Sequence, residues 1–159
     1  MQSSAVTQAI KLAKDALIRP FEGYATRLPD GGCKAYPDPG TGGHPWTIGY
    51  GSTGPNINKD TVWTHQQAEE SFEEHVQYFC NGVLNLCPNL IKHPRRLAAI
   101  ISFAYNVGLG NLRISTLRRR VIAEDWVGAQ SEIVRWNKAN GRVLRGLTRR
   151  REAEAIFLR

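Results

Sequence analysis

The sequence predicts an α+β fold with one helix, then a small β-rich lobe, then a larger helical lobe. Three observations lead to this prediction. Apolar residues recur at helical spacing over residues 5–19, residues 23–58 lose that spacing and become rich in Gly, Pro and Asp, and helical spacing returns from residue 64. A chain of 159 residues is long enough to bury a core. We therefore expect a single domain over residues 1–159, with a cleft between its lobes.

The first helix is expected to cover residues 5–19. Its apolar side chains, among them Ala9 and Ala16, return every three or four positions and so share one face. Pro20 is expected to end the helix near Arg19, because proline lacks the N–H that the helical ladder needs.

Residues 23–58 hold the turn-rich part of the chain. The stretch KAYPDPGTGGHPWTIGYG, residues 34–51, contains five glycines and three prolines. Its last six residues, 46–51, are typical of one strand of a hairpin. We expect a small, irregular sheet with long loops here.

The helical lobe, over residues 64–159, is expected to begin at Thr64. Thr64 and Gln67 fit the S/T-x-x-E/Q capping box, which satisfies free amides at a helix start. Apolar residues from Ala68 to Val83 follow at helical spacing, and Pro88 closes the segment.

The remaining helices are expected over residues 94–107, 115–123 and 126–136, and from residue 148 onward. The first of these opens with proline and is apolar almost all round, which is typical of a helix inside a core. The last helix is expected to turn Ala153, Ile156 and Phe157 inward.

Positive charge is concentrated near the end of the chain. Residues 1–112 hold nine basic and nine acidic residues, whereas residues 113–159 hold twelve and five, so the net charge of +7 arises there. Such a region attracts polyanions, and the alternative is a solvated helix face that maintains solubility. Within the triplet Arg149, Arg150 and Arg151, at least one side chain must face solvent, because successive helical residues point in different directions.

The three cysteines are expected to be free thiols, at least two of them buried. Cys33, Cys80 and Cys87 are odd in number, and none forms a C-x-x-C pair. Seven residues apart on one helix, Cys80 and Cys87 would stand about 10 Å apart. That separation exceeds the ~7 Å limit for a disulfide. The four histidines lack zinc-binding spacing, so we expect no metal site.

Three polar residues near the β-rich lobe are candidates for glycosidic-bond hydrolysis, which needs a proton donor and a second group that handles water. Glu22 follows the first helix, where partial burial would favour the protonated form of a general acid. The alternative is a solvated helix end. Turn chemistry alone would explain Asp38, and strand propensity alone would explain Thr47.

Together these motifs resemble the bacteriophage-type lysozymes, the endolysins of glycoside hydrolase family 24. The resemblance rests on FEG at residues 21–23, AYPD at 35–38, WTIGYG at 46–51 and nearly all of residues 102–154. It implies a lysozyme-like fold and a muramidase activity on the β-1,4 bond between N-acetylmuramic acid and N-acetylglucosamine in peptidoglycan. It implies no metal and no organic cofactor.

The resemblance also implies roles for individual residues. Glu22 would protonate the leaving oxygen, Asp38 would orient or activate water, and Thr47 would hold that water. Inversion at the anomeric carbon is implied, with the two carboxyl groups about 6.5–9.5 Å apart. Arg142 is expected near the general acid.

Three aromatic residues of the β-rich lobe are candidates for substrate binding. Tyr36, Trp46 and Tyr50 would stack against sugar faces, and the alternative is that they close a small core.

The chain departs from the family pattern in its loop lengths. Asp38 follows Glu22 by sixteen positions and Thr47 follows Asp38 by nine, more than in the commoner members. Gly- and Pro-rich loops absorb such insertions at small cost. The longer loop makes Asp30 a rival for the role of Asp38, although LPDGG is better interpreted as a turn.

Three other functions compete with a hydrolase. A lytic transglycosylase would use Glu22 alone and leave a 1,6-anhydro sugar, a zinc amidase would cut the peptide stem, and a non-enzymatic module would bind polyanions through residues 113–159. We expect a monomer that acts on peptidoglycan, contacts anionic wall or outer-membrane surfaces, and binds no nucleic acid. The sequence shows no signal peptide and no membrane-spanning run. We therefore expect accumulation in the host cytoplasm and release through a separate pore.

Overall fold

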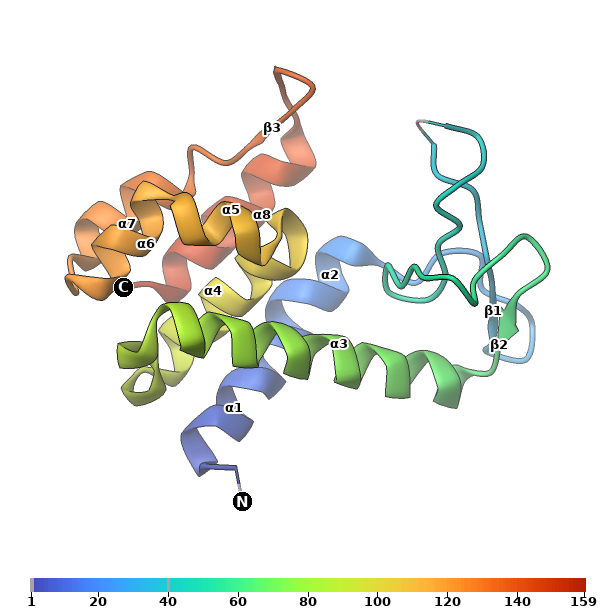
Figure 1. The fold of residues 1–159 in the computed structure, drawn as a ribbon, viewed down its shortest axis with the longest axis horizontal. Helices are drawn as coiled ribbons and strands as arrows, with labels where there is room; N and C mark the ends of the chain where they lie inside the picture. The colour runs from blue at the N-terminus through green and yellow to red at the C-terminus, as the bar shows by residue number, and fades with distance from the viewer. Residues whose placement is uncertain (1, 40) are drawn as a thin grey trace. The chain divides into compact units, whose positions relative to one another are not determined.

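The computed structural model describes residues 2–39 and 41–159. It divides the chain into two compact units. Residues up to Phe21 together with Val76–Arg159 form what we call the helical unit, and Glu22–His75 form the loop-rich unit. The elements in Figure 1 are α1 (Ser4–Leu12), η1 (Ala13–Ile18), α2 (Arg19–Glu22), β1 (Cys33–Lys34), β2 (Val62–Trp63), α3 (His65–Leu86), η2 (Pro88–Lys92), α4 (Pro94–Val107), α5 (Leu109–Ile114), α6 (Thr116–Ile122), α7 (Trp126–Ile133), β3 (Lys138–Ala139), β4 (Arg142–Val143) and α8 (Arg145–Phe157).

Helices dominate this architecture, and the described strands form two short antiparallel pairs. β1 pairs with β2, with Cys33 opposite Trp63, and β3 pairs with β4, with Ala139 opposite Arg142. The predicted α+β class is confirmed. No helix within the described residues is both long and apolar enough to cross a membrane.

α4, drawn in yellow in Figure 1, forms the centre of the helical unit. Every residue from Leu97 to Ala104 is buried, and α1, η1, α5 and α8 all contact this helix. Pro94 occupies its first turn, where the missing N–H costs nothing. The prediction that this nearly uniformly apolar segment is a core helix is therefore confirmed.

The first helical segment runs further than the sequence predicted. α1, η1 and α2 follow one another without a break, so the prediction that Pro20 ends the helix is wrong. η1 is π-helical, and the N–H of Arg19 bonds the carbonyl of Lys14, five residues back. The wider turn lets the chain pass Pro20, whose missing N–H falls in the first turn of α2, where proline is tolerated. Glu22 is therefore the last helical residue.

α3 begins as the capping box predicts. The N–H of Gln67 donates to Thr64 Oγ1 (3.1 Å), and the N–H of Thr64 donates to Gln67 Oε1 (2.8 Å). The helix ends at Leu86, ahead of Pro88. Its buried stripe consists of Ala68, Phe72, Val76, Cys80 and Val83.

The end of the chain differs from the prediction in its elements. α7 stops at Ile133 and the β3–β4 hairpin follows it, with φ of 51° at Asn140 and 75° at Gly141. Two successive positive φ values define the type I′ turn that joins two-residue hairpins. α5 was not expected from the sequence, and α8 begins at Arg145, three residues before the predicted start of the last helix at residue 148.

The inward face of α8 is charged. Ile156 is 47% exposed, so the prediction that it points inward is wrong. Arg150, Arg151 and Glu154 are buried instead, and Arg149 is the exposed member of its triplet. This confirms that the three arginines do not share one environment.

All three cysteines are free and buried, which confirms that Cys80 and Cys87 are not joined. Cys80 lies on α3, and Cys87 is the first residue after that helix.

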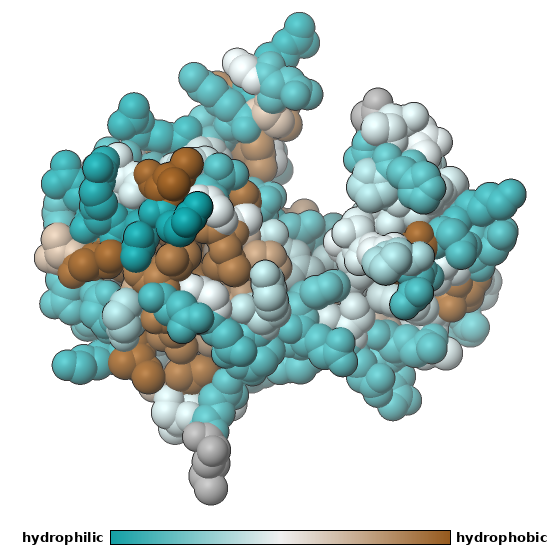
Figure 2. Space-filling model, in the orientation of Figure 1, coloured by the Kyte–Doolittle hydropathy of each residue, from teal (hydrophilic) through white to brown (hydrophobic). Residues whose placement is uncertain are grey.

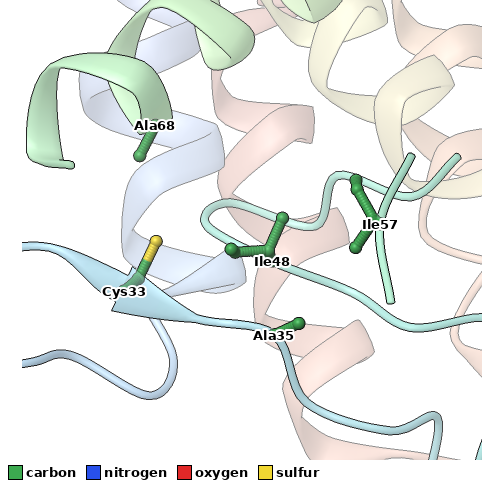
Figure 3. Packing of buried hydrophobic residues seen from close by; sticks show 5 residues of the cluster. All are labelled: Cys33, Ala35, Ile48, Ile57 and Ala68. Atoms are coloured by element: carbon green, nitrogen blue, oxygen red, sulfur yellow. The ribbon is translucent and has the colours of Figure 1, made fainter. Parts of the chain in front are cut away.

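The loop-rich unit has a small core of its own. Its buried cluster is shown in Figure 3 and consists of Cys33, Ala35, Ile48, Ile57 and Ala68. Among the described residues, strand pairing across the expected hairpin consists of two isolated pairs, Tyr36 with Thr47 and Ile48 with Ser52. The segment over residues 46–51, predicted as one strand, therefore reverses direction between Ile48 and Ser52. β2 lies beyond the expected β-rich range of 23–58, because Val62 and Trp63 pair with β1.

Candidate active site

Glu22 lies against the backbone of Gly51. Its side chain is half-buried at the end of α2. A Cβ placed on Gly51 would stand 3.6 Å from Glu22 Oε2, so the carboxylate and this glycine are van der Waals neighbours. Gly51 has a φ of +94°, a conformation that favours glycine. The WTIGYG segment thus places the backbone of Gly51, which has no side chain, next to Glu22, the proposed general acid.

Tyr36 and Thr47 form an antiparallel pair beside this carboxylate. The N–H of Tyr36 donates to the Thr47 carbonyl (2.8 Å), and the N–H of Thr47 donates back to the Tyr36 carbonyl (2.9 Å). Paired residues in an antiparallel ladder present their side chains on the same face. Burial and the negative charge of Glu22 raise the pKa of Tyr36. The phenol therefore stays protonated at neutral pH, and Glu22 lies near enough for its charge to act on it.

Asp38 stands two residues after Tyr36, at the base of a loop. Its N–H bonds the Gly43 carbonyl (3.0 Å), its carbonyl accepts from Gly42 (2.8 Å), and its carboxylate Oδ2 accepts from the N–H of Thr41 (3.0 Å). These bonds fix the position of a half-buried carboxylate close to the Tyr36–Thr47 pair. Residue 40, within the same loop, lies outside the described residues.

Asp30 has a similar local bond but a different position. Its carboxylate Oδ1 accepts from the N–H of Gly32 (2.9 Å), as expected of a turn residue. Asp30 is exposed and precedes β1, whereas Asp38 is separated from the Tyr36–Thr47 pair by one residue. Asp30 thus has the local bond of a turn residue, and the catalytic role of Asp38 in place of Asp30 stays a prediction.

Two of the three candidate aromatic residues contribute to packing. Tyr50 is only 7% exposed, stacks on Phe72 with ring centroids 4.6 Å apart, and donates to Glu69 Oε1 (3.2 Å). Trp46 is partly buried against the small core. Of the three, Tyr36 and Trp46 retain more exposed surface than Tyr50.

The turn after Thr47 is anchored to α3. Ile48 and Ser52 exchange two backbone hydrogen bonds of 2.9 Å each. The buried hydroxyl of Ser52 lies 2.9 Å from Ser71 Oγ and 3.2 Å from His75 Nδ1. These contacts hold the backbone that carries Gly51 and Thr47, so the site rests on short-range polar contacts as well as on the small core.

Arg142 belongs to the helical unit, where it is an exposed residue of β4. Next to its hairpin lies a cavity of about 420 Å³. This cavity is lined by residues that the sequence analysis did not select, including Asn106, Asn111, Trp136, Lys138, Leu144 and Leu147. Asn106 and Trp136 fall within the segment that carried the family resemblance, which is the signal that could have found them.

Among residues 2–39 and 41–159, no group of three or more His, Cys, Asp or Glu side chains is arranged to hold a metal ion.

Known sequences match most of this chain. A family model described as phage lysozyme matches residues 30–154, a range that contains Asp38 and Thr47 and that Glu22 precedes. The endolysin of Bacillus phage B103 is 38% identical over 143 residues, which cover 89% of this chain and 51% of that protein. The chain thus spans about half the length of the first curated relatives it matches.

Solved structures share the fold. The muramidase domain of SpmX from Asticaccaulis excentricus has a TM-score of 0.74 at 24% identity, covering 99% of this chain and 98% of that one. An endolysin from Escherichia coli O157:H7 phage FAHEc1 has a TM-score of 0.70 at 26% identity, with coverage of 99% and 93%. The predicted lysozyme-like fold is confirmed.

Proposed function

Because the chain belongs to the phage lysozyme family, we propose that it acts as an endolysin. In this proposal it hydrolyses the β-1,4 bond between N-acetylmuramic acid and N-acetylglucosamine in peptidoglycan and so lyses the host cell. The observation that carries the proposal is the grouping of Glu22, Tyr36, Asp38 and Thr47 within one compact unit.

Each side chain has a distinct part in the proposed reaction. Glu22 donates its proton to the leaving glycosidic oxygen as the bond to the anomeric carbon breaks. A water held by the Thr47 hydroxyl attacks that carbon from the opposite face, and Asp38 orients the water and accepts its proton. In this inverting scheme the two carboxyl groups stand about 6.5–9.5 Å apart to leave room for the water.

The local geometry supports these roles. The Thr47 hydroxyl donates to the Pro45 carbonyl at 3.3 Å, a long bond that a hydroxyl can exchange for one to water by rotating. The carboxylate of Asp38 accepts a hydrogen bond from the backbone N–H of Thr41 (3.0 Å), which supports the proposed role by fixing its orientation.

The exposure of the three aromatic side chains decides which of them we propose as substrate contacts. Tyr36 and Trp46 are proposed to stack against sugar rings. Because Tyr50 is buried against Phe72, we propose that it supports the turn from behind instead. Arg142, an exposed residue of β4, stays a prediction as a substrate-binding residue.

Product analysis tests the function. Purified peptidoglycan is digested with wild type, Glu22→Gln, Asp38→Asn and the exposed control Glu70→Gln from the same unit. We expect reducing-end muropeptides from wild type and from the control, and a loss of about 10²–10⁴-fold in Glu22→Gln, the usual contribution of general acid catalysis.

Other products would overturn the proposal in identifiable ways. A 1,6-anhydro sugar together with an active Asp38→Asn variant would indicate a lytic transglycosylase. A Glu22→Gln variant with more than a tenth of wild-type activity would remove Glu22 from the mechanism.

The cellular location is a further part of the proposal. We propose accumulation in the host cytoplasm followed by release through a separate pore. Fractionation of cells that express the chain with and without a pore-forming protein tests this, and spontaneous appearance in the periplasm would contradict it.

A further inference from the structure

One cavity of the helical unit is lined mainly by positive side chains. It has a volume of about 350 Å³. No Asp or Glu is among the described residues that line it, and its cations are Lys92, Arg95, Arg96 and Arg159. Like charges gathered around one space produce a positive potential inside it, so the ligand that complements this cavity is an anion.

The four cations come from three elements that pack together. Lys92 ends η2, Arg95 and Arg96 belong to the first turn of α4, and Arg159 follows α8. α4 contacts both η2 and α8. Three of the four cations lie in the part of the chain, residues 1–112, whose charges sum to zero. Folding therefore creates a positive site that the distribution of charge along the sequence does not reveal.

The cations of this cavity are not neutralised by the chain itself. Elsewhere in the helical unit, Arg120 pairs with Asp125 at 3.1 Å. Glu124 approaches the cavity region, but its carboxylate lies 3.3 Å from His93 Nε2. Over residues 2–39 and 41–159, none of the four cations has a carboxylate as an ion-pair partner. An external anion would supply the missing negative charge.

Arg96 is held in one orientation at the cavity wall. Its Nε donates to the Leu158 carbonyl (3.1 Å), and its Nη1 lies 3.3 Å from His93 Nδ1. Its guanidinium also stacks over Trp126, 4.1 Å from the ring centroid. Within the described part of the chain these bonds use two of its five N–H donors, and the others can meet a ligand. A guanidinium that is ordered before binding loses little freedom when an anion arrives.

Arg95 is positioned by an aromatic ring as well. Its guanidinium lies 4.5 Å from the centroid of Phe157. Stacking occupies the face of the guanidinium and leaves the N–H groups at its edge available for hydrogen bonds. Arg95, Lys92 and Arg159 are exposed, so an anion can reach them from solvent.

We propose that this cavity is a phosphate-binding site and that a diphosphate group is its best ligand. The two guanidiniums match the spacing of phosphate oxygens, which each can bind with two parallel N–H groups. Four cations around about 350 Å³ favour two linked phosphates over one, because both the charge and the room are larger than a single phosphate needs. A lipid headgroup and a soluble phosphate share this chemistry, and the experiment below separates the two sources. The inference does not rest on the proposed function.

Titration with inorganic diphosphate tests the site directly. The full chain, labelled with ¹⁵N, is titrated with sodium diphosphate, and separately with sodium phosphate, at an ionic strength held constant with sodium chloride. We expect saturable shifts of the Nε–H signals of Arg95 and Arg96 and of the side-chain amide of Gln8, which also lines the cavity. Diphosphate should bind about tenfold more tightly than phosphate, and both should bind more weakly as salt is raised.

Two double variants with the same change in net charge locate the site. Lys92→Gln/Arg95→Gln removes two exposed cations of the cavity and should weaken diphosphate binding at least about tenfold, the effect of a lost hydrogen bond to a charged group. Arg119→Gln/Arg145→Gln removes two exposed cations that do not line this cavity and should weaken binding about twofold or less, because salt screens distant charges.

A single variant tests the geometry of the anion contact. Arg96→Lys keeps the positive charge but loses the planar fork, so it should also weaken diphosphate binding. If Arg96→Lys does not fold, the two double variants still decide the proposal, because all four of their positions are exposed.

Sedimentation with vesicles identifies the source of the phosphate. Wild type is mixed with vesicles of phosphatidylcholine, with and without phosphatidic acid. Binding to the acidic vesicles that diphosphate displaces and that Lys92→Gln/Arg95→Gln loses would support a lipid headgroup as the ligand. Binding of diphosphate without binding to vesicles would support a soluble phosphate.

Three outcomes would overturn the proposal. Equal weakening in the two double variants would show only a general attraction between charges. Diphosphate that shifts neither Arg95 nor Arg96, or chloride that causes the same shifts at equal ionic strength, would show that the cavity is not a phosphate site. A chain that binds diphosphate but does not cleave purified peptidoglycan would refute the proposed function and leave this inference standing.

Discussion

The two compact units of the chain are stabilised in different ways. In the helical unit, a run of eight consecutive residues of α4 is buried, and several helices contact it. In the loop-rich unit, the buried cluster of Figure 3 consists of five small or medium side chains, and pairings of one or two residues replace extended strands. All three proposed catalytic residues belong to the second unit. The proposed chemistry therefore lies in the unit whose backbone is held by short-range polar contacts as well as by a small core.

The surfaces of the two units differ as well. In Figure 2, brown hydrophobic side chains reach the surface of the helical unit in several places. Ile114 and Val127 are 74% and 76% exposed there, whereas Val62 is the large exposed hydrophobic residue among the described positions of the loop-rich unit. The larger core tolerates apolar side chains that remain outside it, since a folded protein has too little polar surface to cover itself.

The largest expected effect concerns the charged face of α8. Glu154→Ala removes the carboxylate that Arg150 and Arg151 share and leaves two buried cations uncompensated. We expect a loss of about 3–5 kcal/mol in the free energy of unfolding, measured with urea. The exposed neighbour Glu152→Ala should change it by about 0.5 kcal/mol or less. Equal losses in both variants would show that the buried network is not what stabilises the helical unit.

A pair of matched core substitutions compares the units directly. Ile101 on α4 and Ile48 beside Thr47 are both fully buried. Ile101→Ala should cost about 2–5 kcal/mol in the global free energy of unfolding. Ile48→Ala should instead speed hydrogen exchange at the amides of Tyr36 and Thr47 and leave α4 protected, because small units open locally. Equal acceleration in α4 would mean that the two units open together.

Alkaline pH should weaken the helical unit, which holds Cys80 and Cys87. Burial raises the pKa of each thiol to about 11, and Arg118 partly opposes the shift at Cys87. An unfolded thiol titrates near about 8.5. Between these values the folded state holds the proton more tightly than the unfolded chain does. The stability that the thiols contribute is therefore complete below about pH 8.5 and lost as the pH rises towards 11.

The size of that loss is at most about 1.4 kcal/mol for each unit of pKa difference. Urea midpoints measured across this pH range should fall less in Cys80→Ala/Cys87→Ala than in wild type. Identical pH profiles would assign the alkaline loss to other groups.

The smallest effect is expected at Arg149, the exposed member of the arginine triplet. Arg149→Gln should slow lysis of permeabilised cells on the order of twofold at low salt, and the difference should vanish at high salt through screening. Turnover of a short soluble fragment should not change. Equal loss on both substrates would point to a role in the fold, and no loss on either to a solvated face.

Local signals predicted local structure well. The capping box at Thr64 and Pro94 in a first turn each involve residues within one helical turn, and both are present. The Asn140–Gly141 turn carried an equally local signal, because Asn-Gly is typical of a type I′ hairpin. The turn lies between the helices expected over residues 126–136 and from residue 148, where a connecting loop was a sufficient explanation for Asn-Gly.

Long-range structure could not be predicted in the same way. The phase of the first helix shifts within η1, so Ala16, expected inward, is exposed while Ile18 is buried. Arg150 and Arg151 resembled a solvated charge run, because their partners Ser102 and Asn106 lie more than forty residues away in the sequence. Likewise, Glu22 lies near Tyr36 and Gly51 because of the path of the loop between them. The spacing of apolar residues in the sequence does not predict that path.

The Asn140–Gly141 turn is also a site for deamidation of Asn140. Gly141 has no side chain to shield its backbone nitrogen, which can attack the Asn140 amide carbon, expel ammonia and form a cyclic imide. Hydrolysis of that imide leaves aspartate or isoaspartate and lowers the net charge of +7 by one. Both residues are exposed, and Asn140 is held at positive φ. We expect stored preparations to develop an acidic isoform at this hairpin, detectable by peptide mapping and absent from Asn140→Ser protein.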